Sequence, residues 1–97
     1  MEFKDLKFKI HPEGGVGTHV QFENVTVSIQ AGRLYYSIPR MDNIDSTQYS
    51  KFEVAVWENN NKRKHRYVTH KYLDTEDMVA GWTSKEQINK LLKTLSK

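Results

Sequence analysis

The stretch KFEVAVWE, residues 51–58, decides the fold class of this chain. Its apolar residues Phe52, Val54 and Val56 recur at every second position. Because successive side chains of a strand point to opposite sides, this spacing places all three on one face. The stretch therefore predicts a β-strand that is buried on one face of a sheet.

The segments before this strand predict further strands of the same sheet. Residues 18–30, THVQFENVTVSIQ, keep a period of two but change phase at residues 23–24, which indicates a turn or a bulge. Residues 4–10 and 33–38 also place their apolar side chains at alternate positions, as half-buried strands do. Residues 38–49 show no steady period and are expected to form a long loop.

The C-terminal stretch TSKEQINKLLKTLSK, residues 83–97, predicts an amphipathic helix. Ser84 and Gln87 have the spacing of a capping box, in which each side chain bonds the backbone N–H of the other. Four apolar residues follow at positions i, i+3, i+4 and i+7, which places them on one side of a helix: Ile88, Leu91, Leu92 and Leu95. We therefore expect an α+β fold, with this helix packed on an antiparallel sheet of five or six strands.

Composition limits the classes of protein that this chain can represent. Its 97 residues are enough for a single domain, expected over residues 1–97, with a small core. The absence of cysteine excludes disulfides, cysteine-ligated zinc and thiol catalysis. No apolar run approaches the roughly 20 residues of a membrane span, and the charged N-terminus does not resemble a signal peptide. The net charge of +3 permits a polyanionic partner without requiring one.

The histidines and the glycine-rich segment do not predict a metal site, a cofactor or a catalytic centre. His65 and His70 are five residues apart, so on one strand they point to opposite faces. His11 and His19 flank the GGVG segment, residues 14–17, and are expected to approach each other across a hairpin. This segment leads into a strand and no lysine follows it, whereas a phosphate-binding loop ends in Gly-Lys-Ser/Thr and opens a helix. We therefore expect a protein that is not an enzyme and holds no cofactor.

Three acidic residues, Asp74, Glu76 and Asp77, stand together before the predicted helix. Glycosidase carboxylates face each other across a cleft, whereas these three are neighbours in the chain. Their expected role is solvation, or attraction to the basic segment that precedes them.

The most basic segment is ENNNKRKHRYVTHKY, residues 58–72. Asparagine tolerates the backbone angles of tight turns, so residues 59–61 predict a hairpin loop. The return strand, residues 64–73, would then carry charged side chains on both faces, which is typical of a strand at the edge of a sheet. Lys and Arg on an edge strand discourage aggregation between sheets, and this role alone can explain the charges.

A second interpretation of the same segment is a binding surface. Aromatic side chains among basic ones hold single-stranded nucleic acid on many small β domains, by stacking and phosphate pairing. The same surface could dock an acidic protein surface or a phosphorylated small molecule. A homo-oligomer that holds a nucleotide between its subunits is a further alternative. The candidate contact residues are Arg63, Lys64, Arg66, Lys71, Tyr67 and Trp57.

Three stretches together resemble small orphan proteins of tailed bacteriophages: FENVTVSIQ at 22–30, FEVAVWENNNK at 52–62 and DMVAGWTSKEQINKLL at 77–92. They cover somewhat more than a third of the chain. The sequence departs from the phage pattern by lacking a glycine after Asn24, and its basic hairpin is not part of that pattern. The resemblance brings no assigned activity and no functional residue.

The resemblance does indicate a kind of role. Small phage accessory proteins without enzyme motifs often bind host components stoichiometrically, and some inhibit CRISPR effectors or sequester nucleotide signals of host immunity. We therefore expect a non-catalytic phage accessory protein that binds and inhibits a host protein or protein complex in the host cytoplasm. Nucleic-acid binding and nucleotide binding remain the alternatives.

Overall fold

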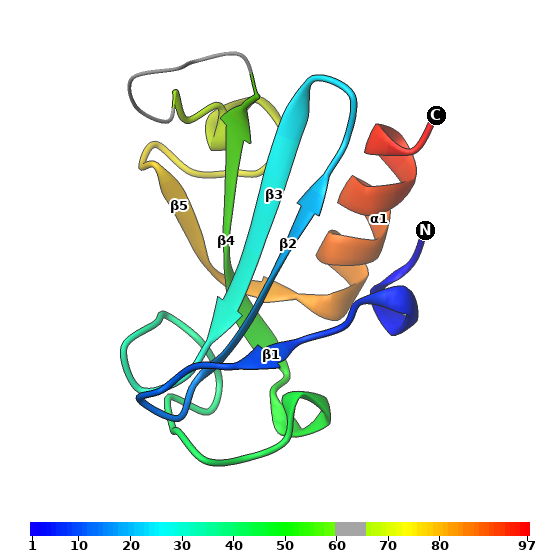
Figure 1. Ribbon diagram of the computed structural model, residues 1–97. Helices are drawn as coiled ribbons and strands as arrows, with labels where there is room; N and C mark the ends of the chain where they lie inside the picture. Colours follow the sequence, from blue (N-terminus) through cyan, green and yellow to red (C-terminus); the bar gives the residue numbers. More distant parts are fainter. Residues whose placement is uncertain (60–65) are drawn as a thin grey trace.

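A computed structural model describes residues 1–59 and 66–97 of the chain. These residues form a five-stranded antiparallel sheet in which every strand pairs with its neighbours in sequence, and one α-helix follows the last strand (Figure 1). The predicted α+β fold is thus confirmed. The strands and the helix are β1 (Lys9–Ile10), β2 (Val16–Gln21), β3 (Val25–Ala31), β4 (Lys51–Glu58), β5 (Val79–Ser84) and α1 (Lys85–Leu95).

The central strands β3 and β4 form the apolar floor of the core. Val27 pairs with Val56 and Ile29 with Val54, and all four side chains are fully buried. The strand predicted from KFEVAVWE is therefore correct. The phase change at residues 23–24 is a tight turn between β2 and β3.

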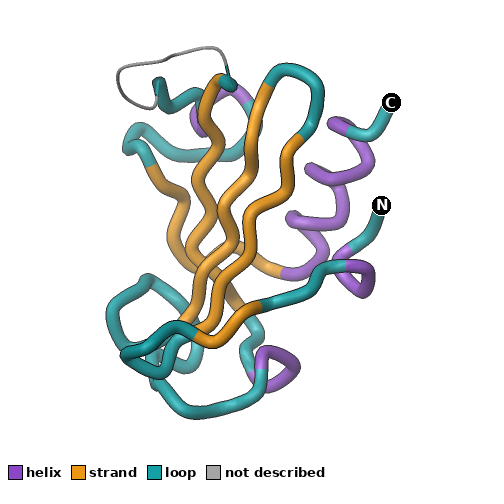
Figure 2. The backbone as a smooth tube through the Cα atoms, viewed as in Figure 1, coloured by secondary structure: helices purple, strands orange, loops and turns teal. Residues whose placement is uncertain are grey.

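Helix α1 covers this apolar face of the sheet (Figure 2). Ile88, Leu91 and Leu92 are buried in the same cluster as the valines of β3 and β4. Ser84 accepts a hydrogen bond from Gln87 N, and Gln87 Oε1 accepts one from Ser84 N, so the predicted capping box is present. Burying an aliphatic side chain contributes roughly 1.5–3 kcal/mol, so these three residues hold the helix on the sheet.

The opposite side of the sheet, here called the outer face, is more polar. Across residues 1–59 and 66–97, no α-helix packs on it. The pairing of β2, β3 and β4 arranges its side chains in three rows, each read from β2 to β4: Gln21, Thr26 and Trp57; His19, Ser28 and Ala55; Gly17, Gln30 and Glu53.

Two of the predicted strands are wrong in extent. Residues 4–10 were expected to be one strand, but only Lys9–Ile10 pair with β2, and Phe3–Asp5 form a 3-10 turn (η1). Phe3, Phe8 and Phe52 pack their rings together, with centroids 5.2 to 5.8 Å apart, and this packing draws the N-terminus toward the core. Ile10 lies outside that contact and is 81% exposed.

Residues 33–38 do not form the expected strand. Their backbone turns after Gly32, whose positive φ of 145° is unfavourable for residues that carry a side chain. The Ser37 hydroxyl accepts a hydrogen bond from Gly32 N and donates to Pro39 O, which holds the turn in place. Single backbone contacts join this segment to the sheet: Ile38 forms an isolated bridge to Lys51, and Tyr36 O accepts a hydrogen bond from Trp82 N.

Strand β5 was not predicted from the sequence. Its pairing with β4 is interrupted between Phe52 and Val54 by an irregularity that contains Gly81 and Trp82. Trp82 has a positive φ of 51°, and its side chain is 52% exposed. Such a bulge breaks the alternation of apolar and polar residues by which a strand is recognised.

Candidate functional site

The predicted aromatic contact residues Trp57 and Tyr67 do lie together. They form an isolated antiparallel bridge, and their rings meet edge to face with centroids 6.0 Å apart. His19, on β2, packs against the Trp57 ring at 5.2 Å, also edge to face. These three side chains form an aromatic cluster at one end of the outer face. Arg63 and Lys64, the other residues predicted beside Trp57, lie outside the described residues.

The predicted return strand is shorter than expected. Glu58 N donates to Arg66 O and Val68 N donates to Val56 O, so residues 66–68 pair antiparallel with the end of β4, but the strand does not continue beyond Val68. After Tyr67 the chain turns into the core, where Val68 and Thr69 are buried, and then forms the 3-10 turn η3 (Thr69–Lys71). The Thr69 hydroxyl accepts a hydrogen bond from Val56 N at 2.9 Å and donates one to Met78 O at 2.7 Å. It thereby joins the chain beyond Val68 to β4 and to the segment before β5, so residues 69–72 do not continue the two alternating faces of a strand.

The described basic residues of the predicted surface are separated from each other. Arg66 Nε lies 3.1 Å from Glu58 Oε1, a carboxylate oxygen that has no hydrogen bond within the described residues. Lys71 lies elsewhere, in a hollow of about 300 Å³ that it shares with Gln87 and Lys90 of α1. The structure thus joins Trp57 to Tyr67, pairs Arg66 with an acid, and places Lys71 beside the helix.

A chain of polar side chains crosses the other end of the outer face. His11 Nε2 lies 2.6 Å from Gln30 Oε1, and Gln30 Nε2 donates to Ser28 Oγ at 3.0 Å. A Cβ at Gly17 would lie 1.9 Å from Gln30 Oε1, so this arrangement requires glycine at that position. An amide does not act as an acid or base at neutral pH. These hydrogen bonds therefore fix the orientation of the His11 and Gln30 side chains and do not form a proton relay.

His11 and His19 were expected to approach each other across the hairpin, and they do line one hollow. It measures about 350 Å³, and Gly17 and Gln30 form part of its wall.

Tyr35 packs near His11, with ring centroids 6.0 Å apart. Burial, followed by the nearby carboxylates of Glu13, Glu53 and Asp42, raises the pKa of the Tyr35 hydroxyl. Across residues 1–59 and 66–97, no three metal-ligating side chains come together.

The GGVG segment packs against the loop before β4. Gly14 N donates to His11 O at 2.9 Å, and Gly14 O accepts from Asn43 N at 2.8 Å. A Cβ at Gly14 would lie 2.6 Å from Asn43 Oδ1, so the glycine allows the two loops to touch. The N–H and C=O groups of Gly14 therefore form hydrogen bonds inside the protein and do not point toward a ligand.

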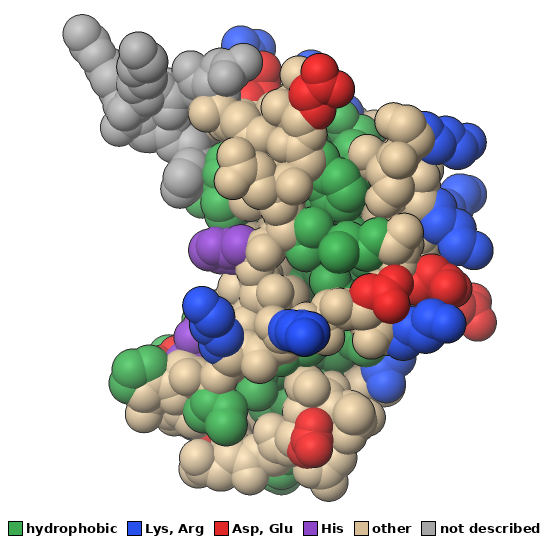
Figure 3. Space-filling model, turned by 45° about the vertical axis from the view of Figure 1, so that its right-hand side comes forward, with side chains coloured by type: hydrophobic (Ala, Val, Ile, Leu, Met, Phe, Trp, Pro, Cys, Tyr) green, Lys and Arg blue, Asp and Glu red, His purple; other side chains and the backbone are tan. Residues whose placement is uncertain are grey.

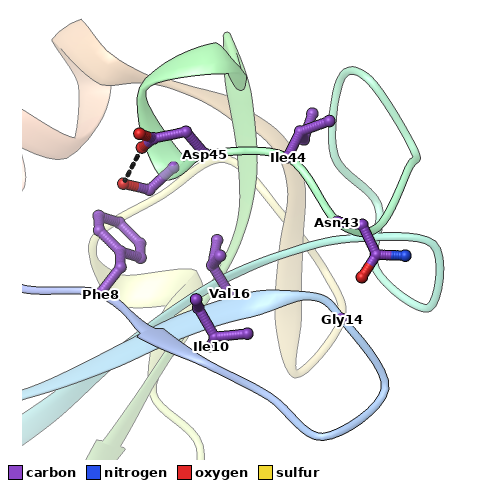
Figure 4. A pocket seen from close by; sticks show the side chains of 8 residues that line it. Phe8, Ile10, Gly14, Val16, Asn43, Ile44 and Asp45 are labelled. Carbon is purple, nitrogen blue, oxygen red and sulfur yellow. Dashed lines mark hydrogen bonds between the residues drawn. The ribbon is translucent and has the colours of Figure 1, made fainter.

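A larger hollow of about 490 Å³ lies between β1, β2 and the same loop (Figure 4). Phe8, Ile10 and Ile44 give it an apolar wall, and Asp45 supplies a carboxylate at its rim. Hydrogen bonds from Thr47, its backbone N–H above all, lower the pKa of the Asp45 carboxyl. Among the described residues that line this hollow, Asp45 is the only acid or base, and general acid–base catalysis usually needs a second such group.

Several exposed lysines lie on the helix side of the molecule. Lys90, Lys93 and Lys97 are exposed there, and Figure 3 shows Lys and Arg side chains along that edge.

None of the helices in the described residues is long and apolar enough to cross a membrane. Comparisons of the chain with protein-family models, with curated proteins and with solved structures give no match.

Proposed function

We propose that this chain is a non-catalytic binding protein that inhibits a host factor and contacts it with the outer face of its sheet. The observation that carries the proposal is the contrast between the two faces. One face is filled by Ile88, Leu91 and Leu92 of α1, whereas the outer face presents imidazole, amide, indole and hydroxyl groups. Aromatic anchors among adaptable polar groups are typical of protein–protein contact surfaces.

The distribution of charge supports a protein partner over a nucleic acid. A polyanion requires several positive side chains that converge on its phosphates. Among the described residues, Arg66 is paired with Glu58, and Lys71 lies beside α1. The outer face also carries the carboxylate of Glu53, which would repel phosphate.

The phage context of the proposal rests on the sequence resemblance. The described residues of its three stretches fall on β3, β4 and β5 with the first turns of α1, and these three strands are neighbours in one sheet. The resemblance therefore concerns the scaffold that supports the outer face. We propose that the inhibited factor is a protein of host anti-phage defence and that the inhibition takes place in the host cytoplasm.

A plaque assay tests this proposal with two matched double variants. Phage would be plated on hosts that each carry one defence system and express the chain. His19→Ala/Gln21→Ala removes two exposed side chains of the outer face, and Lys90→Ala/Lys93→Ala removes two exposed side chains of α1. All four residues are exposed, so thermal unfolding should confirm that both variants fold.

We expect the wild-type chain and the helix variant to restore plating on at least one host, and the outer-face variant to fail there. Absence of rescue on every host would contradict the defence-inhibitor role. Rescue by the outer-face variant together with failure of the helix variant would place the contact on α1 instead.

Nucleic-acid binding remains the second candidate because Trp57 and Tyr67, which stand before and after the basic segment at residues 62–66, form a ring pair. Its test is fluorescence anisotropy with labelled single- and double-stranded oligonucleotides at two salt concentrations. Phosphate contacts predict affinity that falls steeply as salt rises. No binding at low salt would exclude this candidate.

A further inference from the structure

A second aromatic pair, Tyr36 and Trp82, lies where β5 bulges away from β4. Their ring centroids are 5.0 Å apart, with the planes tilted by 35°. Both rings are accessible, since Tyr36 is 44% and Trp82 52% exposed. Two large aromatic side chains therefore meet at the surface.

The backbone around this pair is shaped to hold it. Trp82 N donates to Tyr36 O at 2.9 Å, which ties the 33–38 segment to β5. A Cβ at Gly81 would lie only 2.8 Å from Tyr36 Cβ, so glycine lets the tyrosine rest directly on the strand. Trp82 itself has a φ of 51°, in the left-handed region that a bulky side chain rarely adopts. Unfavourable backbone conformations of this kind are concentrated at functional sites.

Carboxylates line the same hollow as the two rings. It measures about 430 Å³, and Asp74 and Asp77 form part of its wall. Thr75 shapes the acidic turn, because its hydroxyl accepts from Asp77 N at 3.1 Å and donates to Val79 O at 2.9 Å. Within residues 1–59 and 66–97, no basic side chain forms an ion pair with either aspartate.

We propose that this hollow binds the side chain of an arginine presented by a protein partner. A guanidinium group stacks on aromatic faces and pairs with carboxylates through its planar set of N–H donors. The protein already shows the first of these contacts, since the Arg40 guanidinium lies 5.1 Å from the centre of the Tyr36 ring. Arg40 does not line the hollow, so a second guanidinium can enter between Trp82 and the aspartates.

The proposal does not depend on the proposed inhibitory function and can be tested on the isolated chain. The probe is Nα-acetyl-arginine amide, and the control is Nα-acetyl-citrulline amide, which has nearly the same shape but no charge. In ¹H–¹⁵N NMR spectra, we expect the arginine compound to shift the indole N–H signal of Trp82 and the amide signals of Asp74 and Asp77. The signals of Trp57 should not move, and citrulline should have no effect.

Two variants separate the contributions of the ring and the carboxylates. Trp82→Gly removes the ring and suits the left-handed backbone, so the chain should remain folded. Asp74→Asn/Asp77→Asn removes the charges but keeps the side-chain shape. We expect Trp82→Gly to weaken binding of the arginine compound by about two- to five-fold, the size of an exposed cation–π contact. The aspartate variant should weaken it by up to about five-fold, the size of an exposed ion pair. Glu23→Gln/Glu86→Gln, which neutralises two exposed acids outside the hollow, should leave affinity unchanged.

Three results would overturn the proposal. One is an equal response to citrulline, which would show that charge is not recognised. Another is an equal response of Trp57, which would show that binding is not confined to this hollow. The third is unchanged affinity in Trp82→Gly, measured from the Asp74 and Asp77 amide signals.

Discussion

Replacing Thr69 by valine should destabilise the protein strongly although the two side chains have the same shape. Thr69 is fully buried, and its hydroxyl bridges the backbone of β4 to the chain just before β5. Valine fills the same space but neither accepts from Val56 N nor donates to Met78 O. The substitution therefore leaves two backbone groups without these partners.

The size of the effect follows from where those two groups lie. Val56 is fully buried, so its N–H cannot find water, and an unsatisfied buried donor costs about 1–3 kcal/mol. Met78 is 63% exposed, so water can partly replace the hydrogen bond to its carbonyl. We expect a loss of about 2–3 kcal/mol in the free energy of unfolding, which corresponds to roughly 10–20 °C in Tm for a domain of this size.

The assay is chemical and thermal unfolding followed by circular dichroism, with Thr69→Ser as the matched control. Serine keeps the hydroxyl and loses one methyl group, which costs about 1 kcal/mol. The expected order of stability is wild type, then Thr69→Ser, then Thr69→Val. If the valine variant were as stable as the wild type, or more stable than the serine variant, the two hydrogen bonds of the hydroxyl would not contribute the stability inferred here.

Three further substitutions test separate parts of the structure. Ser84→Ala removes the cap that accepts from Gln87 N and should lower the free energy of unfolding by about 0.5–2 kcal/mol in urea titrations; an unchanged midpoint would contradict the capping role. Burial, followed by the Asp42 carboxylate, raises the pKa of the Tyr49 hydroxyl above 10.0, so the folded state holds this proton more tightly than the unfolded state does. The contribution of Tyr49 to stability should therefore be fully present below pH 10 and be lost as the pH rises above it. Tyr49→Phe should reduce the fall of Tm with pH in that range, and an identical fall in wild type and variant would contradict this contribution. Arg66→Ala should change Tm by only a few degrees, because its ion pair is 69% exposed on the arginine side and such pairs contribute about 0–1 kcal/mol; a large loss would give Arg66 a structural role.

The parts of the fold that could be predicted are those in which buried residues recur with the regular spacing of a strand or a helix. Residues 51–58 alternate because one face of β4 lies against the core, and Ile88, Leu91 and Leu92 recur at helical spacing because α1 lies on that face. The turn at residues 23–24 also left a signal, since an apolar period cannot change phase inside a regular strand.

The parts that could not be predicted depend on contacts distant in sequence. Residues 64–73 have strand-like composition, but Thr69 bonds to Val56 and Met78, and no local pattern shows that its hydroxyl will be buried. For the candidate site, the prediction that Trp57 and Tyr67 lie near each other is correct. The prediction that Lys71 lies with them is wrong, because it depended on a continuous strand from residue 64 to residue 73. The Tyr36–Trp82 pair was missed since its two residues are 46 positions apart (82 − 36) and meet only through the bulge of β5.

The aromatic cluster of His19, Trp57 and Tyr67 and the Tyr36–Trp82 pair are close enough to contact one partner. Trp57 stands four residues along β4 from Glu53, beside the bulge that carries Trp82, which corresponds to about 13 Å of strand. A protein contact of ordinary size covers about 800 Å² on each side, so it can include both groups. At this separation their contributions to binding should add independently, because residues more than about 7–10 Å apart without shared contacts seldom couple. A partner that used both groups would lose affinity in the His19→Ala/Gln21→Ala variant and in Trp82→Gly, and the combined variant would lose the sum of the two binding free energies.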